Sequence, residues 1–145
     1  MAAERTAQVT WSGSLMEGAG RIESTGSGVL AGQEVTWASR SEPCESGRTS
    51  PEELIAAAHA ACFCMALSHG LAQAGHAPER LQARATSTFV PGTGITQMRL
   101  ELTGKVPGVD EAGFREAAEG AKANCPVSKA LAGNVEITLD ARLES

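Results

Sequence analysis

Two cysteines stand two positions apart in the stretch "AACFCMAL", residues 60–67, inside a run that otherwise has the composition of a buried helix. Successive residues of a helix are rotated by about 100°, so Cys64 points roughly 160° away from Cys62. The two thiols therefore face different neighbours and cannot form a disulfide with each other within the helix. Cysteine also packs well as a small apolar residue, and we interpret Cys64 as packing.

Cys125 has the local surroundings that most favour a reactive thiol. In "ANCPVSK", Pro126 suits the first position of a helix, which makes Cys125 the predicted N-cap. A thiol there faces unpaired backbone N–H groups and the positive end of the helix dipole, and both favour the thiolate. The residue types leave two interpretations open: a reactive thiol, or a cysteine that replaces serine as a plain cap.

The remaining cysteine and the histidines give weaker signals. Cys44 lies in a polar loop beside Glu45, whose charge disfavours a thiolate, and we interpret it as an exposed bystander. His59 and Cys62 have the i, i+3 spacing of one helix face, but no set of four ligands accompanies them, so we expect no metal site. The absence of a CxxC pair from the sequence weakens a thioredoxin-like or zinc-ribbon interpretation.

The first fifty residues are predicted to form strands followed by a loop. Alternation in "QVTWSGSL", "RIEST" and "EVTWAS" predicts a three-stranded meander with glycine-rich turns. Arg40 ends the third predicted strand, a place where functional side chains often lie, although a solvated charge is the commoner fate of an arginine. The polar stretch "RSEPCESGRTS", residues 40–50, is predicted to be a loop.

The clearest local signal is the start of a long helix. "SPEE" supplies Ser50 as N-cap and Glu53 three residues later, the pattern of a capping box. The predicted helix covers residues 51–74, roughly 35 Å, and Gly75 is placed to end it. Its residues are apolar nearly all round, which predicts burial on most sides. Glu52 lies in the first turn, where the helix dipole alone accounts for a carboxylate.

The second half of the chain alternates strands and helices. Residues 81–90 and 95–106 flank "PGTG" and are predicted to form a hairpin. Asp110 caps a second helix, "NCPVSKAL" begins a short third helix, and "NVEITLDARL" is a final strand. The order βββ-α-ββ-α-α-β predicts an α+β fold with antiparallel sheet packed on helices, in a single domain covering residues 1–145.

Composition excludes some function classes. The chain has 145 residues and a net charge of −5, which disfavours binding to a nucleic-acid backbone. The N-terminus lacks an apolar signal region, and the longest apolar run, Ile55–Leu67, contains His59 and is too short to span a bilayer. We therefore expect a cytoplasmic protein without a membrane partner. Four cysteines in that reducing compartment point to chemistry rather than to disulfide staples.

Several motifs together resemble one family. "SPEELIAAAHAACFCMALS" is followed by "NCPVSKAL", with "STGSGVL" upstream and "VEITLD" near the end, and these stretches are similar to those of the OsmC/Ohr family, specifically its OsmC branch. The resemblance covers essentially the whole chain. It implies an α+β fold with sheets around a long central helix, an intertwined homodimer with active sites at the subunit interface, and a thiol peroxidase that reduces organic hydroperoxides to alcohols.

The resemblance also implies a role for each candidate residue. Cys62 matches the cysteine that attacks the peroxide, and Cys125 matches the resolving cysteine that forms an intrachain disulfide with it. Glu52 matches the carboxylate that orients the active-site arginine, and Arg40 fits that arginine better than Arg21 does. Since ten helical residues span roughly 15 Å, the site of Glu52 and Cys62 is expected to be completed by the partner subunit.

The implied cycle needs a dithiol reductant, small or protein-bound, with a lipoyl-type dithiol as one candidate, and no metal, flavin or haem. Apolar residues around Cys62, including Phe63 and Met65, would favour organic hydroperoxides. A competing interpretation is a non-catalytic redox sensor or small-molecule-binding protein of the same fold. A third is a structural domain with core cysteines. Steady turnover of an organic hydroperoxide with a dithiol distinguishes the peroxidase from the sensor or binding protein and from the structural domain.

Overall fold

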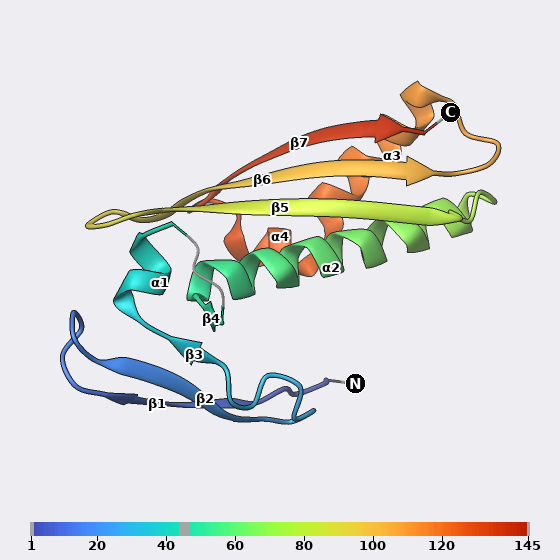
Figure 1. Cartoon of the computed structure of the whole chain (residues 1–145). Coiled ribbons are helices and arrows are strands. Elements are labelled where there is room, and N and C mark those ends of the chain that lie inside the picture. The colour runs from blue at the N-terminus through green and yellow to red at the C-terminus, as the bar shows by residue number, and fades with distance from the viewer. Residues whose placement is uncertain (1, 44–46, 145) are drawn as a thin grey trace. The chain divides into compact units, whose positions relative to one another are not determined.

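The computed structural model describes residues 2–43 and 47–144, which form two compact units, residues 2–54 and residues 55–144. Figure 1 labels their helices and strands. Within the described residues, the first unit has a four-stranded sheet and the second a three-stranded sheet with helices. The predicted α+β class is therefore confirmed. Cys44 and its predicted surroundings lie outside the described residues.

The first unit is built on a sheet in the order β1-β2-β3-β4. β1 (Ala7–Ser12) pairs antiparallel with β2 (Ala19–Thr25), and β2 pairs antiparallel with β3 (Glu34–Val35), which confirms the predicted meander. β4 (Arg48–Thr49) adds to β3 in parallel. The segment 40–50, predicted as a loop, therefore contributes a short strand to this sheet.

The third strand is shorter than its alternating sequence predicted. The chain turns into α1 (Trp37–Ser41), so Arg40 lies on a helix and not at the end of a strand. A capping box explains this: the Thr36 hydroxyl accepts from the Ser39 N–H at 3.0 Å, and the Ser39 hydroxyl accepts from the Thr36 N–H at 2.8 Å. This reciprocal pair satisfies two backbone donors and begins a helix where alternation alone suggested a strand.

α2 (Pro51–Gln73) is the long helix that the sequence predicted, and the boundary between the two units falls in its first turn. The Ser50 hydroxyl accepts a hydrogen bond from the Glu53 N–H at 3.1 Å, which confirms Ser50 as the N-cap. Gly75 adopts a left-handed φ of 87°, the conformation that glycine allows at a helix end.

By length and composition alone, α2 is long and apolar enough to cross a membrane, with a mean hydropathy of 1.6. The expectation that its apolar run is too short is therefore wrong, because the helix continues beyond Ile55–Leu67 on both sides. The core helix of a globular unit passes the same test. α2 buries Phe63, Leu67 and Leu71 in the core of the second unit.

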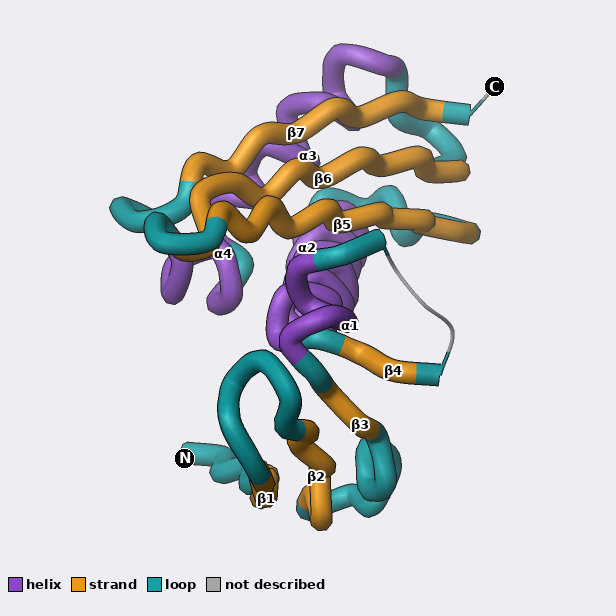
Figure 2. The backbone as a smooth tube through the Cα atoms, turned by 60° about the vertical axis from the view of Figure 1, so that its left-hand side comes forward, coloured by secondary structure: helices purple, strands orange, loops and turns teal. Residues whose placement is uncertain are grey.

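The second unit has the strand order β5-β6-β7. β5 (Arg80–Val90) and β6 (Gly94–Lys105) form the predicted antiparallel hairpin. α3 (Glu111–Asn124) and α4 (Pro126–Leu131) follow, and β7 (Glu136–Leu143) then pairs with β6 in parallel. The sheet is mixed rather than antiparallel, because α3 and α4 form a crossover that returns the chain to the same end of β6. Figure 2 shows these strands side by side.

One face of this sheet packs on helices. Leu100 and Leu102 of β6 meet Phe63 of α2 and Phe114 of α3 in one buried cluster. Gly104 is needed for this contact, because a Cβ there would lie 2.5 Å from the Phe114 ring.

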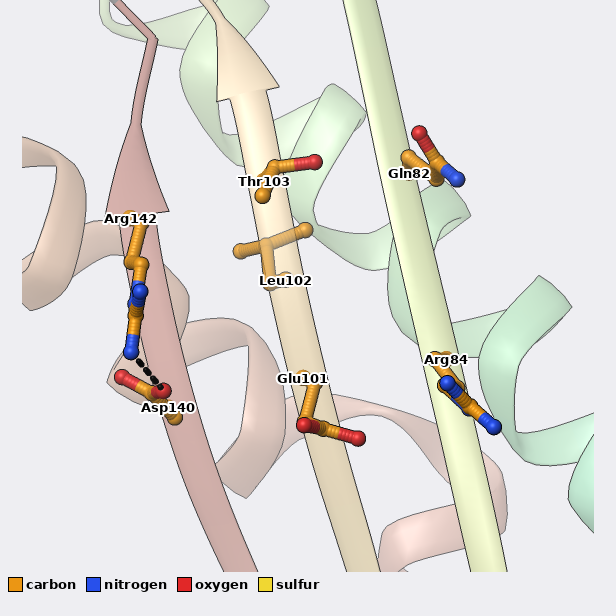
Figure 3. A pocket seen from close by; sticks show the side chains of 7 residues that line it. All are labelled: Gln82, Arg84, Glu101, Leu102, Thr103, Asp140 and Arg142. Atoms are coloured by element: carbon orange, nitrogen blue, oxygen red, sulfur yellow. Dashed lines mark hydrogen bonds and ion pairs between the residues drawn. The ribbon is translucent and has the colours of Figure 1, made fainter.

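The opposite face is polar (Figure 3). A hollow of about 370 Å³ on it is lined by Gln82, Arg84, Glu101, Leu102, Thr103, Asp140 and Arg142. Arg142 pairs with Asp140 at 3.3 Å. The lining holds no cysteine and no histidine, so this hollow is an ionic sheet surface and not the thiol site.

Candidate active site

Cys62 and Cys125 lie together in the second unit. Cys62 is on α2, and Cys125 is the N-cap of α4. The Cys62 thiol donates a hydrogen bond to the Cys125 sulfur. Both are free thiols; the Cys125 side chain is completely buried and Cys62 is half-buried. Two thiols far apart in sequence are therefore in contact, which is the arrangement that an intrachain disulfide requires.

The backbone of Cys125 is fixed by two helices. Its N–H donates to the Ala121 carbonyl at 2.8 Å and so ends α3, while its own carbonyl accepts from the Lys129 N–H at 3.0 Å and so begins α4. Pro126 occupies the first position of α4, as the sequence predicted. Cys125 is thus both the C-cap of α3 and the N-cap of α4, so two helices fix the position of its thiol.

The surroundings of Cys125 favour its thiolate. Burial raises its pKa, but hydrogen bonds from the Ser128 N–H, the Cys62 thiol, the Ser128 hydroxyl and the Val127 N–H outweigh burial and lower that pKa below its ordinary value. The sulfur makes no cap hydrogen bond of strict geometry, yet these donors converge on it. Of the two interpretations of Cys125, the reactive thiol is the one that these contacts favour.

The surroundings of Cys62 have the opposite effect. Burial raises the pKa of the Cys62 thiol, and its hydrogen bond to Cys125 raises that pKa further, because a thiol that donates a proton to a neighbour is held neutral. The Val127 N–H offsets part of this. In the thiol pair itself, therefore, Cys125 is the better thiolate, and Cys62 needs a further positive group to ionise.

Cys64 lies on another side of α2, as the helical spacing predicted. Burial raises its pKa, with a partial offset from the backbone of Ala83 on β5. No hydrogen bond links it to Cys125. It is half-buried and lines a hollow with Met65, Ser68 and Leu81, away from Cys125. Its packing role stays a prediction.

Arg40 and Glu52 form an ion pair within the first unit. The Arg40 Nε donates to Glu52 Oε1 at 2.9 Å. Glu52 is only 6% exposed, and its Oε2 has no hydrogen-bond partner among the described residues. A buried carboxylate requires a compensating cation, so α1 and the first turn of α2 hold this arginine in place. The predicted pairing of Glu52 with Arg40 rather than with Arg21, which lies exposed on β2, is observed.

An apolar cavity opens beside Arg40 in the same unit. Its volume is about 410 Å³, and its lining is Trp11, Leu15, Val35, Thr36, Trp37, Arg40 and Pro51. The Trp11 ring covers Gly20 of β2, where a Cβ would lie 2.8 Å from the ring. Two tryptophans and one guanidinium therefore line the same mostly apolar space.

Sequence reasoning missed this cavity and named Phe63 and Met65 instead. Phe63 is completely buried in the core of the second unit and has no surface to offer a ligand, so that expectation is wrong. Met65 is 73% exposed in the single chain. The signal that was available is the rarity of aromatic residues, since the only tryptophans of the sequence, Trp11 and Trp37, both line the cavity.

A buried polar pair next to the thiols was also missed. The His59 Nε2 lies 2.7 Å from the Ser128 Oγ, and both side chains are buried. Among the described residues no group of three or more potential ligands is arranged to hold a metal ion. The partner of His59 in this structure is the Ser128 hydroxyl. Its i, i+3 spacing with Cys62 places the two residues on the same face of α2.

Comparisons with known proteins agree on one family. A family model described as OsmC-like protein matches residues 44–140. The chain is 43% identical to Peroxiredoxin OsmC of Escherichia coli (strain K12), with both chains fully covered. It is 34% identical over 97 residues to the organic hydroperoxide resistance protein of Xanthomonas axonopodis pv. citri, covering 63% of this chain and 65% of that protein.

Solved structures give the same result. The organic hydroperoxide resistance protein OhrB of Bacillus subtilis aligns over 94% of this chain and 98% of its own, with a TM-score of 0.65 and 27% identity. The organic hydroperoxide resistance protein of Elizabethkingia anophelis aligns over 99% and 100% of the two chains, with a TM-score of 0.72 and 26% identity.

Proposed function

The chain belongs to the OsmC-like protein family and is a cysteine-based hydroperoxide peroxidase, and we propose that Cys62 and Cys125 are the two thiols through which it works. The observation that carries this assignment is the hydrogen bond between the two side chains in the second unit. Because Cys62 is half-buried, it is the thiol that a substrate reaches. Cys125 is buried and is the thiol that reacts afterwards with the oxidised Cys62.

In the first step, the Cys62 thiolate attacks the terminal oxygen of the hydroperoxide. The O–O bond breaks, the alkoxide takes a proton and leaves as an alcohol, and Cys62 becomes a sulfenic acid. Because burial and Cys125 raise the pKa of Cys62, the step needs a cation, and we assign this role to Arg40. Glu52 orients the guanidinium through its charge-assisted hydrogen bond at 2.9 Å.

In the second step, the Cys125 thiolate attacks the sulfur of the Cys62 sulfenic acid. The S–S bond forms, the S–O bond breaks, and the leaving hydroxide takes a proton as water. A dithiol then reduces the disulfide by exchange, and a lipoyl-type dithiol is the candidate we propose. Closing the disulfide protects Cys62 from further oxidation to the sulfinic acid.

The substrates we propose are organic hydroperoxides. The apolar cavity of about 410 Å³ beside Arg40 supports this, because it can bury an alkyl or aryl group while the guanidinium polarises the peroxide end. Hydrogen peroxide has no apolar part to bury there. Discrimination of tenfold or more in favour of an aryl hydroperoxide over hydrogen peroxide is the expected order of magnitude.

Mass spectrometry of the oxidised protein tests the assignment of the two thiols. After one equivalent of an aryl hydroperoxide, we expect a single peptide pair joined through Cys62 and Cys125, with Cys64 still a thiol. With one equivalent of the hydroperoxide, the Cys125→Ser variant is expected to release one equivalent of alcohol and to stop at the Cys62 sulfenic acid. With excess hydroperoxide, a second equivalent is expected to oxidise Cys62 to the sulfinic acid and to release a second alcohol, since no thiol captures the sulfenic acid. A disulfide that involves Cys64 instead would contradict the assignment.

We propose that the protein is a homodimer. α2 is apolar all round, yet only 22% of its most apolar window is buried in the single chain, and Ala57, Ala58, Ala61 and Met65 are exposed. A helix of this composition is expected to be covered on most sides, and a second copy would cover the exposed side. The partner subunit would also complete the site formed by Glu52, Arg40 and Cys62.

Disruption of this face is the corresponding prediction. Met65→Glu is expected to convert the dimer into a monomer, because a charge would replace a 73% exposed apolar side chain at the centre of the contact. Light scattering after size-exclusion chromatography measures the mass. Gln82→Glu, on the polar face of the second sheet, is the matched control and should remain dimeric. A wild-type monomer at micromolar concentration would contradict the proposal.

We further propose that residues 1–145 act as one functional domain in the cytoplasm. The support for one domain is that the 43% identity to Peroxiredoxin OsmC of Escherichia coli extends over the full length of both chains. The support for the compartment is chemical: Cys62 and Cys125 must return to free thiols after each cycle, which a reducing environment allows.

A further inference from the structure

His59 and Ser128 are two buried polar residues that have no role in the steps described so far. His59 is completely buried on α2, one helical turn before Cys62, and Ser128 is 3% exposed on α4, one turn after Cys125. Their side chains meet at 2.7 Å. A buried polar pair inside an apolar core has a desolvation cost, so its contacts are expected to serve a purpose beyond packing.

The direction of the hydrogen bond follows from the partners of the imidazole. Burial lowers the pKa of His59, so the ring is neutral and carries one N–H. Its Nδ1 is buried and has no hydrogen-bond partner among the described residues. A buried N–H without an acceptor is rarer than a buried acceptor without a donor, so the proton belongs on Nε2. His59 Nε2–H therefore donates to the Ser128 Oγ.

The Ser128 hydroxyl then has its own hydrogen to give. Its oxygen accepts from His59, and the hydroxyl also interacts with the Cys125 sulfur. The chain of donors thus runs from His59 through Ser128 to Cys125, and each bond polarises the next. Cys62, from α2, is the titratable group that acts directly on the same sulfur.

We propose that His59 and Ser128 are positioning residues whose hydrogen-bond relay donates to the Cys125 sulfur and prepares it to close the disulfide. The inference rests on the resolving role proposed for Cys125. The relay supplies no electrons: the hydroperoxide has already oxidised Cys62, and the relay holds the attacking sulfur ionised while hydroxide leaves Cys62. It is expected to act on the second step and not on the first.

Titration of Cys125 alone tests the relay. In a background of Cys44→Ser, Cys62→Ser and Cys64→Ser, the ultraviolet absorbance of the thiolate reports the pKa of Cys125, and the serine at position 62 still provides a donor. Ser128→Ala is expected to raise that pKa by about one unit, and His59→Leu by about half a unit. Ser128→Thr and His59→Gln keep a donor and are expected to restore most of the shift. His69→Leu, an exposed histidine of α2, is the control.

Kinetics in the protein with all its cysteines separate the two steps. Ser128→Ala is expected to slow the decay of the Cys62 sulfenic acid about tenfold near neutral pH, with alcohol release in the first turnover within about twofold of wild type. Nitrogen-15 NMR of the wild-type histidines is expected to show His59 protonated on Nε2, a measurement that needs no variant.

Three results would overturn the relay: a proton on Nδ1 of His59, an unchanged pKa of Cys125 in both Ser128→Ala and His59→Leu, or a first step slowed as much as the second. Failure of the proposed function looks different. If the wild-type protein forms no Cys62–Cys125 disulfide, the resolving role of Cys125 fails, and the relay's part in disulfide closure fails with it.

Discussion

Cys62→Ser is expected to abolish peroxide consumption, with a loss of about a thousandfold or more in steady-state turnover with an organic hydroperoxide and a dithiol. A serine hydroxyl is not ionised near neutral pH and cannot form a sulfenic acid, so no oxidising equivalent is stored on the protein. Consumption of cumene hydroperoxide, followed by a colorimetric peroxide assay, measures this effect.

Cys64→Ser is the matched control for that variant. Cys64 lies two positions away on the same helix but has no hydrogen bond to Cys125, and burial raises its pKa. Its replacement is expected to leave turnover within about twofold of wild type. Full activity of Cys62→Ser, or loss of activity in Cys64→Ser alone, would show that the nucleophile has been assigned to the wrong thiol.

Arg40→Met is expected to cause the second largest loss, about a hundredfold in the first-turnover rate near neutral pH. Burial and the hydrogen bond to Cys125 already raise the pKa of Cys62, so removal of the cation raises it further. A raised thiol pKa means less thiolate at a given pH below it. The lost rate is therefore expected to return in part as the pH rises, and a pH profile of alcohol release in the first turnover checks the sign.

A double variant separates this effect from stability. Arg40→Met leaves the carboxylate of Glu52, 6% exposed, without its cation, which destabilises the fold. Arg40→Met/Glu52→Gln removes that buried charge and is expected to recover thermal stability while activity stays low. Arg84→Met removes a cation from the polar face of the second sheet and should change neither thermal stability nor activity. Recovery of activity in the double variant would contradict a role for Arg40 in ionising Cys62.

Local sequence signals predicted several elements correctly because their causes are local. The Ser50 cap, the glycine at position 75 and the Pro126 position each depend on residues within one helical turn, and all three appear in the structure. The same kind of signal also accounts for the error at α1, since the Thr36–Ser39 capping box outweighed an alternating pattern. A pattern of alternation is weaker evidence than a set of satisfied backbone donors.

Contacts between distant segments could not be predicted in this way. The parallel pairing of β7 with β6 depends on how α3 and α4 pack, and the hydrogen bond between His59 and Ser128 joins α2 to α4. The cavity lined by both tryptophans likewise combines β1, β3, α1 and the start of α2. Each depends on the packing of whole elements, which no short window of sequence contains.

The sequence by itself determined the α+β class, the long helix that carries Cys62, and the N-cap position of Cys125, because helix caps and apolar periodicity act over a few residues. The tertiary structure decided which groups surround each sulfur: donors from Ser128 and Val127 around Cys125, and burial together with the bond to Cys125 around Cys62. The reason is that desolvation and hydrogen bonding to a sulfur are set by the neighbours that folding assembles around it.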